Sequence, residues 1–296
     1  MILIEKCPVC QGISFTKKAT CTDHTASKEK FNIVSCETCG FRLTNPRPKN
    51  ERLGVYYDSD MYISHTNSSA GLFNWIYQTV RSYSIKTKVS LLKSLNLSGT
   101  QHLDIGCGTG EFLRACEVAG FNTKGIEPSE IARKKAIKNY GLSVSANSDL
   151  SRLGKSKFDS ISMWHVLEHI SNLNETISEF KRILKANGKI IVAVPNYSCW
   201  DANYYKEYWA AWDVPIHLWH FSKKTIVQVF KNHGFQLIKT KPMLFDAYYV
   251  SLLSEEFCSG KKNFLKSFIV GTLSNVIGFL TKRGYSSITY VFEKRI

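Results

Sequence analysis

Between residues 101 and 194 the chain alternates short apolar runs with longer segments in which apolar residues recur at a helical spacing. Short apolar runs are typical of buried strands, whereas the helical spacing is typical of amphipathic helices. Strands that alternate with helices predict a parallel sheet with helices on both faces. The expected strands cover residues 101–105, 122–126, 158–163 and 188–194, and the expected helices cover about 111–119, 129–139 and 173–185.

The pattern continues on both sides of this region. Residues 72–97 carry an apolar stripe at a spacing of about 3.6 residues, which predicts a helix. A further helix is expected at 222–233 with Ser222 as its N-cap, because a serine side chain can accept a hydrogen bond from the first helical turn. Strands near 235–241 and 286–293 would complete the sheet.

The first 45 residues differ from the rest, since they are rich in Cys, Thr, Lys and Ser and contain few long apolar runs. Pro46 and Pro48 follow them, and prolines interrupt regular structure. We therefore expect a small module at 1–48, a helical linker or cap at 49–97, and an α/β domain at 98–296 with substrate-side insertions at about 197–221 and 245–284.

A glycine-rich turn follows the expected strand at 101–105. Gly106, Gly108 and Gly110 occupy alternate positions, where the lack of a Cβ lets the backbone turn sharply and approach a ligand closely. The helix that begins after them offers unpaired N–H groups and partial positive charge to an anionic group. Ligands bind just beyond the strand ends of open α/β sheets, so this turn is a candidate ligand site.

Two acidic residues make this turn more specific. It has the spacing G-x-G-x-G after Asp104, whereas the dinucleotide-binding fingerprint is G-x-G-x-x-G. Glu127 ends the next expected strand, 23 residues after Asp104. A carboxylate at this place can accept hydrogen bonds from the ribose hydroxyls of an adenosine.

Segments at four places, in the right order, resemble the class I S-adenosylmethionine-dependent methyltransferases. They are LDIGCGTGEFL at 103–113, GIEPS at 125–129, FDSISMWHVLEHI at 158–170 and FKRILKANGKIIVAVPN at 180–196. The resemblance implies an α/β fold with a Rossmann-like seven-stranded methyltransferase sheet and helices on both faces. It also implies S-adenosylmethionine as the cofactor and methyl transfer as the reaction.

By position, the same resemblance implies a set of cofactor-binding residues. They are Asp104, Gly106, Cys107, Gly108 and Gly110 at the methionine half, Glu127 at the ribose, Asp149 at the adenine amino group, and Trp164 beside the cofactor. His165 follows Trp164 and would face the acceptor.

Two C-x2-C pairs lie in the N-terminal module, Cys7 with Cys10 and Cys36 with Cys39. Each pair fits a tight turn that aims two sulfur atoms at one ion, and four thiolates satisfy tetrahedral Zn²⁺. We expect a structural zinc ribbon, because four thiolates leave no open coordination position for catalysis. Cys21 and His24 lie between the pairs, and either could replace one of the four ligands.

The N-terminal region carries a second, looser resemblance. A zinc ribbon followed by NPRP at 45–48 and by the pair Tyr56 and Tyr57 is similar to an arrangement in bacterial methyltransferases, several of which act on sugars or cell-envelope glycans. This resemblance implies a small-molecule or glycan acceptor, including a nucleotide- or lipid-linked sugar of the cell envelope.

Methylation of a hydroxyl requires removal of a proton, and histidine is the usual base because its pKa lies near neutrality. His217 and His220 lie in the aromatic segment WDVPIHLWHFS, which resembles a substrate-side segment of the family. His165 and His169 follow the expected strand at 158–163. Each of the four is a candidate base, and the alternative is that these histidines only brace their loops.

Residues 262–283 are mainly apolar and carry basic residues at both ends. The segment also contains serine, threonine and asparagine and is short for a transmembrane span. Two interpretations stay open: an amphipathic helix at an anionic membrane surface, or a helix packed against the domain or a second subunit.

The formal net charge of +15 attracts polyanions, so an RNA methyltransferase is the main alternative function. Against it, the chain has no recognisable RNA-binding module and no Asn/Asp-Pro-Pro-Phe/Tyr motif. A third alternative is a binding protein that keeps the cofactor fold without catalysis. The first residues show no basic segment before a long apolar run, so we expect a cytoplasmic enzyme, with or without contact to the inner face of the membrane.

Overall fold

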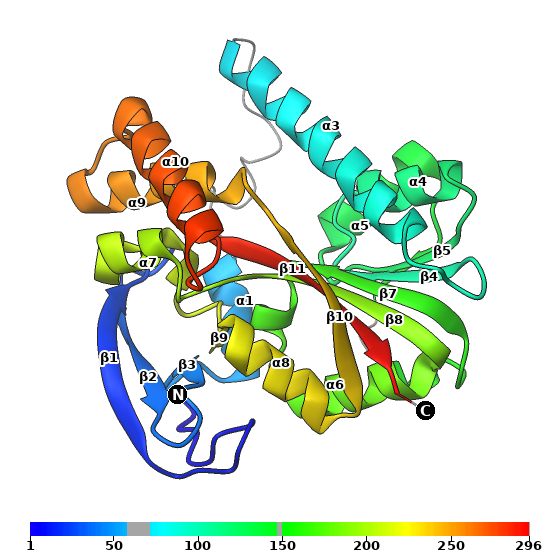
Figure 1. Cartoon of the computed structure of the whole chain (residues 1–296), viewed down its shortest axis with the longest axis horizontal. Helices are drawn as coiled ribbons and strands as arrows, with labels where there is room; N and C mark the ends of the chain where they lie inside the picture. The colour runs from blue at the N-terminus through cyan, green and yellow to red at the C-terminus, as the bar shows by residue number, and fades with distance from the viewer. Residues whose placement is uncertain (58–71, 147–149, 296) are drawn as a thin grey trace.

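The computed structural model describes residues 1–57, 72–146 and 150–295, with the backbone alone at 72–77. Seven strands form the central sheet: β4 (Gln101–Ile105), β5 (Asn122–Ile126), β6 (Val144–Ser145), β7 (Phe158–Trp164), β8 (Leu184–Pro195), β10 (Phe235–Pro242) and β11 (Ser287–Lys294). Their order is β10–β11–β8–β7–β4–β5–β6 (Figure 1). The strands from β6 to β8 are parallel, whereas β11 is antiparallel to both of its neighbours.

This Rossmann-like methyltransferase sheet confirms the predicted fold class. β4 and β5 occupy the predicted residues, and β7 ends one residue later than expected. β8 begins earlier than the apolar run suggests, because Leu184 already pairs with Phe158 of β7. Both central strands are buried over most of their length, which explains why their sequences are almost continuously apolar.

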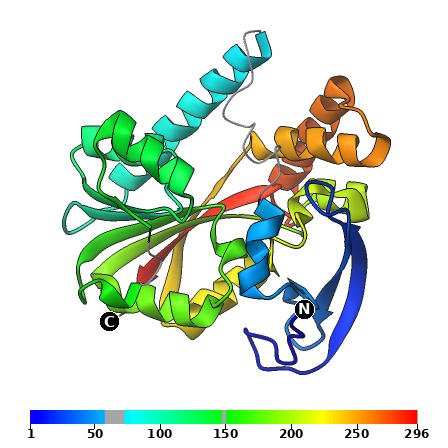
Figure 2. The ribbon, with the colours of Figure 1, turned by 180° about the vertical axis from the view of Figure 1, so that it is seen from behind.

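Helices cover both faces of the sheet (Figures 1 and 2). They are α3 (Leu72–Lys93), α4 (Glu111–Val118), α5 (Glu130–Tyr140), α6 (Leu173–Ile183) and α8 (Lys223–Asn232). On one face, Leu92 of α3 and Phe112 of α4 belong to a core cluster with Ile191 of β8. On the other face, α6 and α8 pack with the next residue, Val192, because side chains alternate along a strand.

The predicted N-cap of α8 is confirmed. The Ser222 hydroxyl accepts a hydrogen bond from the backbone N–H of Thr225 at 3.3 Å, and the Thr225 hydroxyl accepts one from the N–H of Ser222 at 2.9 Å. This reciprocal pair satisfies two N–H groups that the helix itself leaves unpaired. Local sequence therefore fixes where the chain leaves the aromatic segment and enters the helix.

A second sheet joins the N-terminal module to the α/β domain. Its strands are β1 (Phe15–Thr22), β2 (Lys30–Cys36), β3 (Arg42–Thr44) and β9 (Trp219–His220), in that order. β9 comes from the aromatic segment of the α/β domain, and its residues pair with Arg42 and Leu43. The helix α1 (Asn50–Tyr57) follows the module. The module and the domain thus share backbone hydrogen bonds, which the sequence pattern does not indicate.

The remaining elements are α7 (Trp200–Tyr205), α9 (Asp246–Ser259), α10 (Phe264–Leu280) and the short 3₁₀ turns η1 (Leu150–Arg152), η2 (Leu167–His169), η3 (Lys206–Tyr208) and η4 (Ala210–Trp212). α9 and α10 follow β10 and precede β11 in the chain. In space they pack against each other and lie beside α7 (Figure 1). Among the helices of the described ranges, none is long and apolar enough to cross a bilayer.

Candidate active site

The glycine turn lies at the carboxyl end of β4 and leads into α4. Gly106, Gly108 and Gly110 have φ angles of 70°, 56° and 88°, a region that side chains with a Cβ rarely adopt. A Cβ on Gly106 would lie 2.5 Å from Cγ2 of Val166. Glycine at 106 is therefore required both by the backbone angle and by the close approach of the segment after β7.

Glu127, at the end of β5, holds this turn in place. Its carboxylate accepts hydrogen bonds from the backbone N–H of Gly108 and from that of Ser129, each at 2.8 Å. Each carboxylate oxygen has two lone pairs, so each can still accept a hydrogen bond from a ligand. The carboxylate and the glycine turn form one rigid unit at the strand ends.

Asp104, the penultimate residue of β4, is almost completely buried. Its Oδ1 accepts a hydrogen bond from the Ser162 hydroxyl at 2.5 Å, and His102 contacts the same hydroxyl at 3.0 Å. Burial raises the pKa of Asp104 to about 7, although the Ser162 hydrogen bond and the charge of Lys88 act to lower it. A cationic group at this edge would favour the ionised form.

The helix α3 contributes two cations that the sequence did not mark as site residues. Lys88 Nζ lies 4.3 Å from the centre of the Trp164 ring, and burial lowers the pKa of this lysine against the opposing charges of Asp104 and Asp246. Arg81 forms a salt bridge of 2.7 Å with Glu111, the first residue of α4. Helix periodicity alone could not show that these polar positions face the glycine turn.

His165 directly follows β7 and lies between two carboxylates. Its Nδ1 is 3.3 Å from Oε1 of Glu168, and its Nε2 is 2.9 Å from Oδ2 of Asp246. Burial acts to lower the pKa of His165, but these two partners outweigh it and raise the pKa to about 10. At neutral pH His165 is therefore protonated, and a protonated imidazole cannot serve as the base.

Glu168 and two further histidines form a compact group beneath it. One ligand atom each of Glu168, His169 and His217 lies within 4.8 Å of the others. Burial acts to raise the pKa of Glu168, but the hydrogen bond and charge of His165 hold it below its ordinary value. Oε2 of this buried carboxylate has no hydrogen-bond partner among the described residues. A negative charge thus faces two imidazole rings.

His169 and His217 have different hydrogen-bond partners. His169 Nδ1 lies 2.9 Å from the hydroxyl of Tyr57, which α1 brings from the N-terminal part of the chain. His217 Nδ1 lies 3.0 Å from the carbonyl oxygen of Ala211, so this nitrogen carries a hydrogen and donates it to the carbonyl. Burial and the neighbouring His217 lower the pKa of His169 to about 3, so its ring is neutral. The other ring nitrogen donates a hydrogen bond to the backbone of Ile216, so the lone pair lies on Nδ1, toward the Tyr57 hydroxyl.

His220, the fourth candidate base, is engaged in the joint between the module and the domain. Its Nε2 lies 3.1 Å from the Thr44 hydroxyl, and its ring packs edge-on against Trp212. Burial holds the pKa of His220 well below its ordinary value. Three of the four candidate histidines therefore meet at Glu168, and Asp149, the candidate adenine contact, lies outside the described residues.

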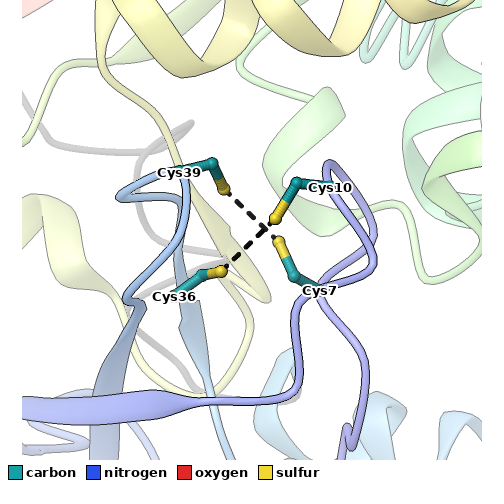
Figure 3. A group of neighbouring side chains, drawn as sticks. All are labelled: Cys7, Cys10, Cys36 and Cys39. Atoms are coloured by element: carbon teal, nitrogen blue, oxygen red, sulfur yellow. Dashed lines mark hydrogen bonds between the residues drawn. The ribbon is translucent and has the colours of Figure 1, made fainter.

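The two C-x2-C pairs come together in the N-terminal module (Figure 3). The Sγ atoms of Cys7, Cys10, Cys36 and Cys39 lie within 4.8 Å of one another, with Cys7–Cys39 at 3.6 Å and Cys10–Cys36 at 3.5 Å. A tetrahedral Zn²⁺ with bonds of about 2.3 Å would separate its sulfur ligands by about 3.8 Å. The spacing suits such an ion.

The two residues that could replace a cysteine ligand lie elsewhere. Cys21 is buried in a core cluster with Trp209 and Trp212. His24 stacks on Phe257 of α9 with ring centres 4.2 Å apart. Neither belongs to the group of four sulfur atoms. Burial acts to raise the pKa of Cys36, but backbone N–H groups and the Cys10 thiol outweigh it and bring the pKa to about 7.

Residues 77–240 match the family model of a methyltransferase domain, which is more than half of the chain. With the observed sheet and glycine turn, this match shows that the chain belongs to the class I S-adenosylmethionine-dependent methyltransferases, and that it is an enzyme of this class.

The relatives of known name support the same class. The ubiquinone biosynthesis O-methyltransferase of Actinobacillus pleuropneumoniae is 33% identical over 116 residues, which cover 35% of this chain and 49% of the relative. The chain thus spans about half the length of such curated methyltransferases. An uncharacterised protein of Methanocaldococcus jannaschii is 28% identical over 54% of this chain and 76% of its own length.

Among solved structures, magnesium protoporphyrin IX methyltransferase from Synechocystis with bound S-adenosylhomocysteine is similar in fold. The TM-score is 0.55 with 14% identity, and the match covers 83% of this chain and all of that one. A methyltransferase from Thermotoga maritima gives a TM-score of 0.52 with 18% identity over 75% of this chain. These similarities show the fold.

Proposed function

We propose that the protein transfers a methyl group from S-adenosylmethionine to a hydroxyl group of a small-molecule or glycan acceptor, with His169 as the proton acceptor. The observation that carries this proposal is the meeting of Glu168, His169 and His217. Glu168 and His169 belong to the segment after β7, and Val166 of this segment approaches Gly106 of the glycine turn closely. The O-methyltransferase relatives support a hydroxyl acceptor.

The cofactor, when bound, supplies an electrophilic methyl group on a sulfonium sulfur. Asp104 would receive its ammonium group, since a buried carboxylate near pKa 7 is stabilised by a cation. The backbone of Gly106, Cys107, Gly108 and Gly110 would surround the methionine half, and the spare lone pairs of Glu127 would accept the ribose hydroxyls. Trp164, fixed by Lys88, would border the methyl group.

His169 is the best placed of the four histidines. His165 is protonated between two carboxylates, and His220 is held at the joint with the module. His217 is more buried than His169, and only His169 has a hydroxyl, that of Tyr57, at its Nδ1. When the acceptor hydroxyl passes its proton through the Tyr57 hydroxyl to Nδ1 of His169, the neighbouring Glu168 carboxylate stabilises the imidazolium that forms.

The group of Glu168, His169 and His217 is also a possible donor set for a divalent cation, since its three ligand atoms are close together. We favour proton transfer, because His169 already shares a hydrogen bond with Tyr57 and its neutral ring lies beside the Glu168 carboxylate. Activity that is unchanged by a chelator selective for weakly bound cations supports this choice. Activity that disappears and returns with Mg²⁺ or Mn²⁺ would overturn it.

The zinc ribbon is part of the same proposal. The four cysteine sulfurs suit a structural Zn²⁺, which would stabilise a module too small to have a large core of its own. The predicted division at residues 48 and 97 assigns the module a supporting role and the segment 49–97 the role of a cap. Tyr57 and Lys88 from this cap both reach the site, which supports that assignment.

The proposed sugar-bearing acceptor rests on the N-terminal arrangement of the chain. The looser resemblance of the ribbon and NPRP segment to sugar-modifying methyltransferases points to this class of acceptor.

The experiment that tests the acceptor class is transfer of labelled methyl from S-adenosylmethionine into a fractionated cell extract. RNA, protein, lipid–glycan and small-molecule pools are counted separately. Label in the small-molecule or lipid–glycan pool is the expected result. Label confined to RNA would overturn the proposal and favour the RNA methyltransferase alternative, for which affinity should fall steeply with salt.

A further inference from the structure

The helix α10 exposes its large apolar side chains. Leu265, Phe268 and Phe279 are 73%, 62% and 77% exposed, although helices on a protein surface normally turn such residues inward. The full exposed set is Phe264, Leu265, Phe268, Ile269, Leu273, Val276, Phe279 and Leu280, which we call the α10 face. A contiguous apolar surface of this kind marks an interaction site.

The inward side of the same helix is small and partly polar. Its buried residues are Ser267, Val270, Gly271, Ser274 and Gly278. A Cβ on Gly271 would lie 2.7 Å from Cδ1 of Tyr248, so α9 and α10 pack closely. The Ser274 hydroxyl donates to Asp201 of α7 at 2.5 Å. The small residues of α10 therefore pack against the protein, and its large apolar side chains point to solvent.

Three further exposed apolar residues extend this surface at the start of α9, namely Leu244, Phe245 and Tyr249. In both views, α9 and α10 lie at the edge of the molecule, on the opposite side from β4 and β5 of the central sheet (Figures 1 and 2). The apolar surface thus belongs to a projecting helix pair rather than to the body of the domain.

The charges around the α10 face are positive. Lys266 is the only charged residue within α10, and its ammonium group pairs with Glu255 of α9 at 2.9 Å. At the ends of the helix, Lys261, Lys282 and Arg283 take part in no ion pair within the described part of the chain. An apolar strip between two unpaired basic ends is complementary to an anionic lipid surface, where acyl chains and phosphates lie at adjacent depths.

We propose that α10 lies flat on an anionic membrane surface, with the α10 face inserted at the boundary of headgroups and acyl chains. Lys261, Lys282 and Arg283 then contact lipid phosphates at either end. A helix of 17 residues is about 26 Å long at 1.5 Å per residue, which suits a position parallel to the surface. This inference does not depend on the identity of the acceptor.

A second copy of the chain fits this surface less well. In a twofold arrangement the face must contact itself, so the basic ends of one helix would approach those of the other. Juxtaposed like charges oppose association, whereas lipid phosphates neutralise them. The bilayer is therefore the occupant that both the apolar strip and its charges favour.

Co-sedimentation of the full chain with vesicles tests the proposal. The probes are vesicles of phosphatidylcholine with a minor share of phosphatidylglycerol, and vesicles of phosphatidylcholine alone. We expect binding to the anionic vesicles at low salt, weaker binding at high salt and much weaker binding to the neutral ones. No sedimentation with the anionic vesicles at low salt would overturn the proposal.

Two double variants separate the apolar and the ionic contribution. Phe268→Ser with Phe279→Ser should weaken binding by about tenfold or more, because two large side chains no longer leave water. Lys282→Glu with Arg283→Glu should abolish the preference for anionic lipid. The matched control is Val118→Ser, which removes another highly exposed apolar side chain on α4 and should leave binding unchanged.

Since all of these positions are exposed, the unfolding temperature of each variant should be close to that of the unaltered protein. A variant that unfolds at a clearly lower temperature is replaced by a single substitution at Leu265. Equal binding by the unaltered protein and by both double variants would contradict the proposal. So would a dimer in analytical ultracentrifugation that the Phe268→Ser, Phe279→Ser variant dissociates, since the face would then bind a second copy.

Discussion

The carboxyl group of Asp104 is buried away from bulk water, and burial destabilises its ionised form. The pKa of about 7 lies above the ordinary value of 3.8. Between these two values the unfolded chain binds fewer protons than the folded one, so stability contributed by this residue falls as pH rises from about 4 to 7. The cost is removed when a cation reaches the carboxylate.

Asp104→Asn should therefore change both stability and cofactor binding. In the absence of cofactor, the variant should gain stability relative to the unaltered protein as pH rises from 5 to 8, because it has no buried charge to form. Its affinity for S-adenosylmethionine should fall by about 10- to 100-fold, as a charge-assisted hydrogen bond is lost. Thermal unfolding across pH and calorimetric titration measure the two effects; identical pH dependence in both proteins would contradict this account.

At the residue scale, local sequence determines how the predicted cofactor residues are grouped, whereas it does not determine the partners of the candidate bases. Gly106, Gly108 and Glu127 lie where the local motif puts them, because one turn and one strand end determine their positions. The partners Tyr57 of His169 and Asp246 of His165 come from distant segments. No local pattern relates such residues, and only the packed fold brings them together.

At the scale of single elements, the glycine turn should tolerate an added side chain poorly. Gly106→Ala places a Cβ 2.5 Å from Val166 and forces a side chain into a backbone region with a φ of 70°. Cofactor affinity should fall by about 10- to 100-fold, since strain of this kind costs about 1–3 kcal/mol. Calorimetric titration with S-adenosylmethionine measures it.

Gly120→Ala is the matched control for that substitution. Gly120 also has a positive φ, of 93°, but a Cβ there would meet no atom within 4 Å. The control should lose some stability and keep its cofactor affinity. If both variants bound cofactor equally well, the close packing of Val166 on the turn would have no role in the site.

The pairing of β3 with β9 connects the N-terminal module to the aromatic segment that contains His217 and His220. Cys36→Ser should therefore disturb more than the module. We expect a lower unfolding temperature, loss of bound zinc and loss of most methyl transfer, whereas Cys258→Ser at an exposed cysteine should change none of the three. Metal analysis, thermal unfolding and transfer of labelled methyl measure these effects. Full activity of a zinc-free Cys36→Ser protein would contradict the proposed supporting role.

The element pattern explains which parts of the fold could be predicted. The predicted strands and helices between 101 and 242 follow from apolar periodicity and from caps such as Ser222, whereas β6, α7 and β9 were not predicted. The pairing of β9 with β3 could not be predicted, because β9 has only two residues and its partner lies far away in the chain. The outward apolar face of α10 was also beyond periodicity, which cannot tell an inward from an outward stripe.

For the whole molecule, three parts converge on one end of the central sheet. Under the proposed function, the glycine turn and Glu127 would form the cofactor side, and Glu168, His169 and His217 the acceptor side. The helix pair α9–α10 is attached at the same place, since Asp246 at the start of α9 contacts His165. A membrane bound by the α10 face would therefore lie on the side from which an amphiphilic acceptor approaches His169.

In the proposed active site, the glycine turn binds the cofactor and His169 accepts the proton, so the two can be impaired separately. The most direct test measures binding of S-adenosylmethionine and methyl transfer to the labelled pool in the unaltered protein, Glu127→Ala and His169→Asn, with His233→Asn as a control. Glu127→Ala should lose cofactor binding. His169→Asn should bind cofactor normally and transfer about 10²- to 10⁴-fold more slowly. Normal transfer by His169→Asn, or its loss of cofactor binding in a folded protein, would contradict the account.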